Sequence, residues 1–573
     1  MNSSGRRGVV SRLRVFPLLT LTAFCIPILL GLAGTWLPAF GFLPVIGADQ
    51  LSLAPFRELF SHPAYPGAMR GTLISGFGAT ILALACSLWI TVTVYGSTLW
   101  RLLIRALSPL LAMPHAAFAI GFGFLVAPSG WLVRLVSPEL TGFTIPPNWL
   151  TVKDPYGVSL TIALALKETP FLLLMCLSGL NQLDMRRTDW IGRSLGYSRV
   201  RIWTRLVLPQ LYSQLRLPVL AVLAYSMSVV DVAMILGPSL PPTLSVLVDR
   251  WFNDPDVYHR LLGAAGATWL LVMTAAAIVL FLGCEWLIRH LTVGRLTDGS
   301  RTTPLDRLRW LGSVSAVGLL AISLGCLLIL VIWSCTGRWP FPAPLPTDYS
   351  LRFWEKGLGL AIGPLAITFL VAALATCIGA VLVVGCLEYE VRLKQQGRRP
   401  DSQWVLWLVY LPLLVPQIAF LFGIQTAAVL LQVEGTLASM VGIHLVFVLP
   451  YIFLTLSNVY RNFDPRYIHV AVAVSGAPVK CFFQVKLPML AKPIAFAMAT
   501  GFAVSVAQYL PTMYLGAGRF MTITTETVSL AGGSDRRIVA VYALCQFLLP
   551  ALVYGVAIFL PAWFFRNRKA MQN

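Results

Sequence analysis

The chain has 573 residues, of which 57% are hydrophobic and only 12% are charged. Soluble domains usually carry about 25% charged residues, so this composition excludes an ordinary soluble enzyme, a disordered chain and a secreted disulfide scaffold. The formal net charge is +20, which points to nucleic acid in a soluble protein but can reflect topology alone in a membrane protein.

Apolar segments long enough to cross a bilayer recur along the whole sequence. A hydrocarbon core of about 30 Å requires about 20 apolar helical residues. Twelve segments meet this length, and they lie at 16–37, 71–95, 103–127, 158–180, 215–237, 262–288, 311–333, 357–386, 404–431, 438–460, 494–515 and 538–565. No small-residue cleavage site follows the first segment, so we expect a retained helix. The expected fold is an all-α polytopic membrane protein with about twelve transmembrane helices.

The basic residues separate between the two sides of these predicted helices. Twelve spans place both termini on one side, and the segments on that side hold the whole excess of Lys and Arg over acidic residues. The positive-inside rule assigns that side to the cytoplasm. We therefore predict a multi-pass protein of the bacterial inner membrane, with cytoplasmic N- and C-termini, a lipid bilayer around it and no nucleic-acid partner.

The second part of the chain repeats the first. A polar segment at 289–310 divides the spans six and six. A shift of 279 residues aligns 178–237 with 457–516 without a gap, and Pro114-His115 matches Pro416-Gln417 at a shift of 302 residues. We predict two parallel six-helix repeats, called here the first half (1–288) and the second half (311–573), joined by a cytoplasmic linker (289–310), with a pathway between the halves.

Motifs for chemistry of the chain's own are absent from the sequence. It contains no C-x-x-C pair, no clustered His spacing and no nucleotide-binding glycine motif. We therefore expect no catalytic residue, no metal and no cofactor. The predicted inner loops are also too short to contain an ATPase, so any ATP would be hydrolysed by another chain.

The inner loop before the fifth span of each half carries the most information. Loop 1 covers residues 189–209 and loop 2 covers residues 464–488. Each sequence predicts a short helix, a small-residue break, a stretch with basic and aromatic residues, and a Pro where the next membrane helix begins. A single loop of this kind fits lipid head groups. Its duplication at one topological position favours a docking surface for a partner protein.

These loops resemble the E-A-A-x3-G-x9-I-x-L-P motif of type I ABC importer permeases, the inner-membrane components of binding-protein-dependent transport systems. The motif positions after the triplet are occupied in loop 1 by Gly196, Leu206, Leu208 and Pro209, and in loop 2 by Ser475, Val485, Leu487 and Pro488, with Gly476 one residue late. The triplet reads Trp190-Ile191-Gly192 in loop 1 and His469-Val470-Ala471 in loop 2, so both copies lack the acidic residue. The fused layout is similar to the single-chain permeases of iron(III), thiamine and YnjC-like uptake systems.

The resemblance implies that each half is a MetI-like bundle whose loop docks on a cytoplasmic ATP-binding subunit. Two such subunits would rock the halves between inward-open and outward-open states. A periplasmic binding protein would deliver a small solute, and the permease itself would hydrolyse nothing. The identity of the solute stays open between iron, thiamine, a polyamine and others.

Four polar residues in the fifth and eleventh spans are candidates for lining the pathway. Asp231 lies in the fifth span and Gln508 near its counterpart in the eleventh, while Ser226 and Ser505 occupy equivalent positions. A carboxylate within the membrane is costly, so it usually faces a cavity or a partner. The alternative is helix–helix hydrogen bonding, which we favour for the two serines. Glu168, beside Lys167, is a weaker pathway candidate.

Two other classes of protein remain to be weighed. An ion-coupled secondary transporter also has parallel halves, but it would need more intramembrane acid or His relays and has no use for the duplicated loops. A membrane scaffold that transports nothing would stimulate no partner ATPase.

Overall fold

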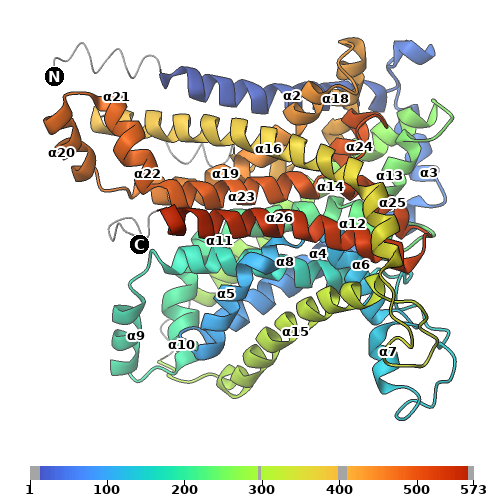
Figure 1. Ribbon diagram of the computed structural model, residues 1–573, viewed down its shortest axis with the longest axis horizontal. Helices are drawn as coiled ribbons and strands as arrows, with labels where there is room; N and C mark the ends of the chain where they lie inside the picture. The colour runs from blue at the N-terminus through green and yellow to red at the C-terminus, as the bar shows by residue number, and fades with distance from the viewer. Residues whose placement is uncertain (1–12, 294–298, 398–408, 565–573) are drawn as a thin grey trace.

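The computed structural model describes residues 13–293, 299–397 and 409–564, and most of the long helices in these ranges run along one common direction (Figure 1). The first half contains α2 (Val15–Ala39), α3 (Ala54–Ser61), α4 (Tyr65–Val94), α5 (Thr98–Ala112), α6 (His115–Val126), α7 (Trp131–Val136), α8 (Val158–Leu180), α9 (Met185–Ser194), α10 (Arg199–Ile202), α11 (Leu208–Ser228), α12 (Asp231–Leu236), α13 (Leu244–Phe252) and α14 (His259–Val293). The second half contains α15 (Arg309–Ser334), α16 (Arg352–Gln395), α18 (Ile418–Leu430), α19 (Leu437–Arg461), α20 (Arg466–Ser475), α21 (Pro478–Cys481), α22 (Leu487–Met489), α23 (Ala491–Ala507), α24 (Leu510–Gly516), α25 (Ile523–Ala531) and α26 (Arg536–Phe564). No β-strand occurs in these described ranges beyond two isolated bridges.

The helices confirm the expected all-α polytopic fold. Ten of the described helices are long and apolar enough to cross a membrane, and an eleventh span results if the bent pair Pro478–Met489 and Ala491–Ala507 is counted as one. The expected span 404–431 begins outside the described residues, and its described part ends in α18, which has only 13 residues. Helices dominate because a bilayer offers no partner for free backbone N–H and C=O groups.

Besides 404–431, three expected spans are interrupted rather than continuous. The span 103–127 breaks at Met113-Pro114, because Pro114 has no N–H to donate and holds Met113 in an extended conformation (ψ 117°). The spans 215–237 and 494–515 break at Val229-Val230 and at Gln508-Tyr509. No proline accompanies the first of these breaks, whereas Pro511 lies in the first turn of α24 after the second. A neighbouring side chain satisfies one of the exposed carbonyls, since Ser245 Oγ donates to Val229 O at 2.8 Å.

The first helix of each half packs against the other half. In Figure 1, α2 lies beside α16 and α18, whereas α15 lies beside α4 and α6. Glycines permit both contacts: a Cβ on Gly423 of α18 would overlap the carbonyl oxygen of Gly31 on α2, and a Cβ on Gly121 of α6 would lie 2.6 Å from Cys326 O on α15. Close backbone approach at small residues is the usual way in which membrane helices associate.

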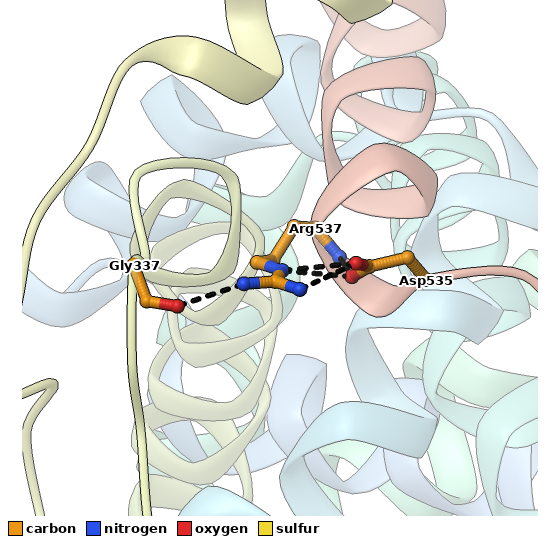
Figure 2. A network of polar contacts seen from close by, with 3 residues as sticks. All are labelled: Gly337, Asp535 and Arg537. Atoms are coloured by element: carbon orange, nitrogen blue, oxygen red, sulfur yellow. Dashed lines mark hydrogen bonds and ion pairs between the residues drawn. The ribbon is translucent and has the colours of Figure 1, made fainter.

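Short helices and ordered loops cover the end of the molecule that is opposite to α9 and α20. Arg537, at the start of α26, donates from Nη1 to Gly337 O at 2.7 Å and pairs with Asp535 at 2.6 Å (Figure 2). This hydrogen bonding from Arg537 lowers the pKa of Asp535. The loop after α15 is therefore fixed to the start of α26. The described chain begins and ends at the other end, together with α9 and α20 (Figure 1).

Candidate functional site

Loop 1 forms a tight helix–turn–helix at one end of the bundle. The turn after α9 is made by Gly196, whose φ of +76° lies in the left-handed region that favours glycine. Gly192 lets α9 approach the next helix, because a Cβ there would lie 2.5 Å from Cγ1 of Ile202 on α10. The break that the sequence predicted at Gly196 is thus a left-handed helix cap.

Loop 2 repeats this shape with a different residue at the turn. Asp464 starts it by accepting a hydrogen bond from the N–H of Arg466 at 2.9 Å, which lowers the pKa of Asp464. Gly476 caps α20 with φ +65°, whereas Ser475 is the last helical residue and donates to Ala471 O. The backbone therefore pairs Gly476, and not Ser475, with Gly196, because the connection to the following helix is one residue shorter in loop 2.

The Leu-Pro end of each loop lies within a widened helical turn. Trp203–Val207 and Phe482–Lys486 are π-helical and lie directly before Leu208-Pro209 and Leu487-Pro488. A proline inside a helix removes one hydrogen bond and crowds the carbonyl four residues earlier, so the turn before it opens. The prolines are thus inside continuous helical segments, where we had expected the membrane helix only to begin. Such π-turns occur often at functional sites.

The two loops join their membrane helices differently. Loop 1 continues without a break into α11, and Arg199–Ser228 counts as one helix. In loop 2 the corresponding helix bends by 71° at Leu490, between α22 and α23. Pro493 accounts for the bend, because it cannot donate to Met489 O one turn earlier.

Each loop is anchored to the end of a long helix of its own half, by different chemistry. In loop 1, Arg199 donates to Val92 O at 3.1 Å and to Tyr95 O at 2.6 Å, at the end of α4. In loop 2, Lys486 donates from Nζ to Oε2 of Glu388 on α16 at 2.6 Å, and both side chains are over 90% buried. Each loop is therefore hydrogen-bonded to a long helix of its own half, loop 1 to α4 and loop 2 to α16.

The outward surface of both loops carries exposed apolar residues among charged ones. Trp190 on α9 is 75% exposed and Val474 on α20 is 85% exposed. The E-A-A positions lie on these helices, with His469 exposed, Ala471 half-buried and Gly192 buried against α10. Leu206, Leu208, Val485 and Leu487 are partly buried behind them. Of the two loops, only loop 1 contacts the described part of the linker, where the N–H of Ser198 donates to Arg301 O at 2.9 Å.

The two left-handed glycines give a direct test of this geometry. A β-branched residue in that conformation costs about 1–2 kcal/mol. We expect Gly196→Val and Gly476→Val to loosen their loops and to speed trypsin cleavage at the basic residues of 181–216 and 461–493. Ser475→Val is the matched control, since Ser475 has a right-handed helical backbone. Equal cleavage of Gly476→Val and Ser475→Val would reject the pairing of Gly476 with Gly196.

A cavity of about 230 Å³ lies between the halves, where the helices are broken. It is bordered by all the interruptions described above, at Met113-Pro114, Val229-Val230 and Gln508-Tyr509, and by a further one at Val415-Pro416 before α18. Broken helices at membrane depth are tolerated where they line a cavity, and they commonly hold substrate sites in transporters. Within the described residues, no group of three or more His, Cys, Asp and Glu side chains could hold a metal ion.

Two of the four predicted pathway residues border this cavity. Asp231, the first residue of α12, and Gln508 both line it, as does Glu168. The two serines are buried behind the wall: Ser505 Oγ lies 2.8 Å from Nδ1 of His444, and Ser226 Oγ has no hydrogen-bond partner among the described residues. Ser505 therefore joins α23 to α19 through His444, whereas Ser226 makes no such contact among the described residues.

Sequence reasoning missed several residues of these sites. Nε2 of His115 lies 2.9 Å from Oε1 of Glu168 at the cavity wall. Lys167, also at the wall, donates from Nζ to Leu110 O. The sequence did contain one signal for the cavity wall, namely the repeated pairs Pro114-His115 and Pro416-Gln417. Both pairs mark helix breaks that border the cavity. Nothing in a single sequence pointed to the Lys486–Glu388 pair, whose members are 98 residues apart.

Comparisons with known proteins agree with the architecture. The chain is 33% identical over 518 residues to the inner membrane ABC transporter permease protein YnjC of Escherichia coli, which covers 90% of this chain and 92% of that protein. It is 20% identical over 170 residues to the spermidine/putrescine transport system permease protein PotC of Haemophilus influenzae, which covers 30% of this chain and 63% of that protein. No protein-family model matches the chain.

Proposed function

The chain belongs to the family of inner-membrane ABC transporter permeases, and on this premise we propose that loops 1 and 2 dock two cytoplasmic ATP-binding subunits that drive solute import. The chain is a multi-pass permease of the inner membrane, and proteins of this family work with ATP-binding subunits and solute-binding proteins. In our proposal the end that carries α9 and α20 faces the cytoplasm, because the basic residues gather there. The periplasmic binding protein then approaches the end that carries α7 and α25.

One observation carries the proposal: the same docking shape occurs twice at the same end. Each copy has an exposed helix, a left-handed glycine and a π-turn before Leu-Pro. Large exposed apolar side chains such as Trp190 and Val474 suit the core of a protein interface. Both copies lack the acidic residue of the motif, so we assign the contact to apolar burial instead of an ion pair.

The anchors link these surfaces to the cavity. When the ATP-binding subunits close, loop 1 pulls α4 through Arg199, and loop 2 pulls α16 through the Lys486–Glu388 pair. Packed interfaces switch between discrete arrangements, so this pull shifts the equilibrium between the inward-open and outward-open orientations of the halves. The chain breaks no bond itself, and ATP is hydrolysed by its partners.

The experiment replaces one exposed apolar residue in each loop with a charge. The double variant Trp190→Asp, Val474→Asp should lose ATP-binding subunits on co-purification from membranes and should lose solute uptake, because the apolar contact is removed at both loops. Leu140→Asp is the matched control for co-purification, since Leu140 is 83% exposed at the opposite end.

Two outcomes would contradict the proposal. One is normal co-purification and uptake in a correctly inserted double variant. The other is uptake that survives ATP depletion while a proton gradient is maintained, which identifies an ion-coupled secondary transporter instead.

A further inference from the structure

The central cavity is charged on one side only. We propose that it binds an organic monocation, whose cationic group lies against Asp231 and Glu168 and whose uncharged remainder bonds to Gln417 and Gln508. This inference rests on the proposed function, because it names the solute class that the pathway accepts. It follows from the unequal contributions of two otherwise corresponding halves.

The corresponding positions of the two walls carry different chemistry. His115 in the first half corresponds to Gln417 in the second, at the shift of 302 residues, and Asp231 corresponds to Leu510, at the shift of 279 residues. Lys167, Glu168, His115 and Asp231 supply every Asp, Glu, Lys, Arg and His of the described cavity wall, and all four belong to the first half. The second half supplies amides, hydroxyls and aromatic rings.

The charged side chains of the first half do not balance one another, and a positive ligand would complete the balance. Lys167 offsets one of the two carboxylates. His115 contacts Glu168 at 2.9 Å and can offset the other carboxylate only by holding a proton. Asp231 is only 8% exposed and borders the cavity directly. A carboxylate in the membrane interior is costly without a partner, so a cationic ligand would supply the missing charge.

The remaining wall fits an uncharged, hydrogen-bonding group. Gln417 and Gln508 offer amides, and Thr455 and Thr500 offer hydroxyls. On the charged side, Tyr225 adds an aromatic ring on which the cation can rest, with its ring centroid 4.9 Å from that of His115. A diamine would leave its second ammonium group against this neutral wall, and a dicarboxylate would be repelled by Asp231. With about 230 Å³, the cavity is smaller than the sites of drug-sized ligands, so the solute is small.

The test measures ligand-induced thermal stabilisation of the full chain in lipid nanodiscs. The probes are choline and ethanolamine as monocations, putrescine as a dication and succinate as a dianion. A ligand that binds the folded state raises its melting temperature, and the rise grows with the ratio of ligand concentration to Kd. We expect choline or ethanolamine to stabilise the chain more than putrescine does, and succinate to have no effect. Asp231→Asn should weaken the apparent monocation affinity about tenfold or more.

A variant that gains putrescine binding tests whether the charge on only one side of the cavity sets the preference, and it leaves the existing site intact. Leu510→Asp places a carboxylate at the position that corresponds to Asp231, so it should shift the preference from the monocations to putrescine. Asp249→Asn is the matched control, because Asp249 is buried and bonds to Tyr514 away from the cavity wall. The proposal is overturned if neither monocation stabilises the wild type, if stabilisation survives Asp231→Asn, or if Leu510→Asp gains no putrescine binding.

The two proposals fail separately. Asp231→Asn should still co-purify with ATP-binding subunits, since the cavity is remote from both loops. The loop variant Trp190→Asp, Val474→Asp should still be stabilised by a monocation. Loss of co-purification alone in the loop variant therefore tests the docking proposal, and loss of stabilisation alone tests the solute class.

Discussion

Lys486→Met should lower the free energy of unfolding by about 3–5 kcal/mol, because it leaves Glu388 buried without its closest cation. Glu388 accepts from Lys486 at 2.6 Å, from Tyr460 at 2.7 Å and from Arg392 at 2.8 Å. Arg392 remains in the variant, at the more exposed edge of the cluster, so we expect the lower part of that range. The measurement is the unfolding midpoint of the detergent-solubilised chain.

A second variant separates the charge from the packing. Replacing both Lys486 and Glu388 with Met should recover part of the lost stability, since apolar side chains of similar volume often replace a buried ion pair at no cost. The recovery is incomplete because Tyr460 and Arg392 lose their acceptor. Lys480→Met is the control, because Lys480 lies exposed in the same loop. If Lys486→Met is no less stable than Lys480→Met, the buried pair does not anchor loop 2.

Gly423→Leu should destabilise the chain by about 1–3 kcal/mol or more, the usual cost of overfilling a packed interface. Its Cβ would overlap Gly31 O and would lie 2.8 Å from the backbone N of Thr35. Both obstacles are backbone, so α2 must move away from α18. The present packing is reinforced by the N–H of Gly423, which donates to Oγ1 of Thr35 at 3.1 Å. Melting temperature in detergent measures the loss.

The corresponding glycine gives an independent repeat of this experiment. Gly121→Leu should act similarly, because its Cβ would meet Cys326 O on α15. Gly318→Leu is the control, since nothing lies within 4 Å of a Cβ at that position of α15. Equal melting temperatures for Gly423→Leu and Gly318→Leu would show that the close approach of α2 and α18 is not needed for stability.

Sequence alone predicted the features that depend on composition and local pattern. Apolar length located the spans, and the duplicated Leu-Pro ends located both loops. The break at Met113-Pro114 carries a proline and could have been recognised. The break at Val229-Val230 could not, because two valines in an apolar run read as an uninterrupted helix and the partner that satisfies Val229 O is Ser245, in another helix.

Contacts between distant segments account for the rest. Hydrophobicity shows that α2 crosses the membrane but not that it packs on α18, because every side of a membrane helix is apolar. Counting residues from Leu487-Pro488 placed Ser475 at the turn of loop 2. The backbone instead turns at Gly476, because the connection to the following helix is one residue shorter than in loop 1. Only the positive φ angle of Gly476 shows this.

The packing of α2 against α18 also constrains how the chain is made. Thr35 and Gly423 are separated by 388 residues, so at ribosomal speeds of about 5–20 residues per second α2 enters the bilayer about 20–80 s before its partner exists. Covalent fusion of the halves keeps the waiting helix at a high effective concentration near the late one, whereas two separate subunits would have to find each other by diffusion in the membrane.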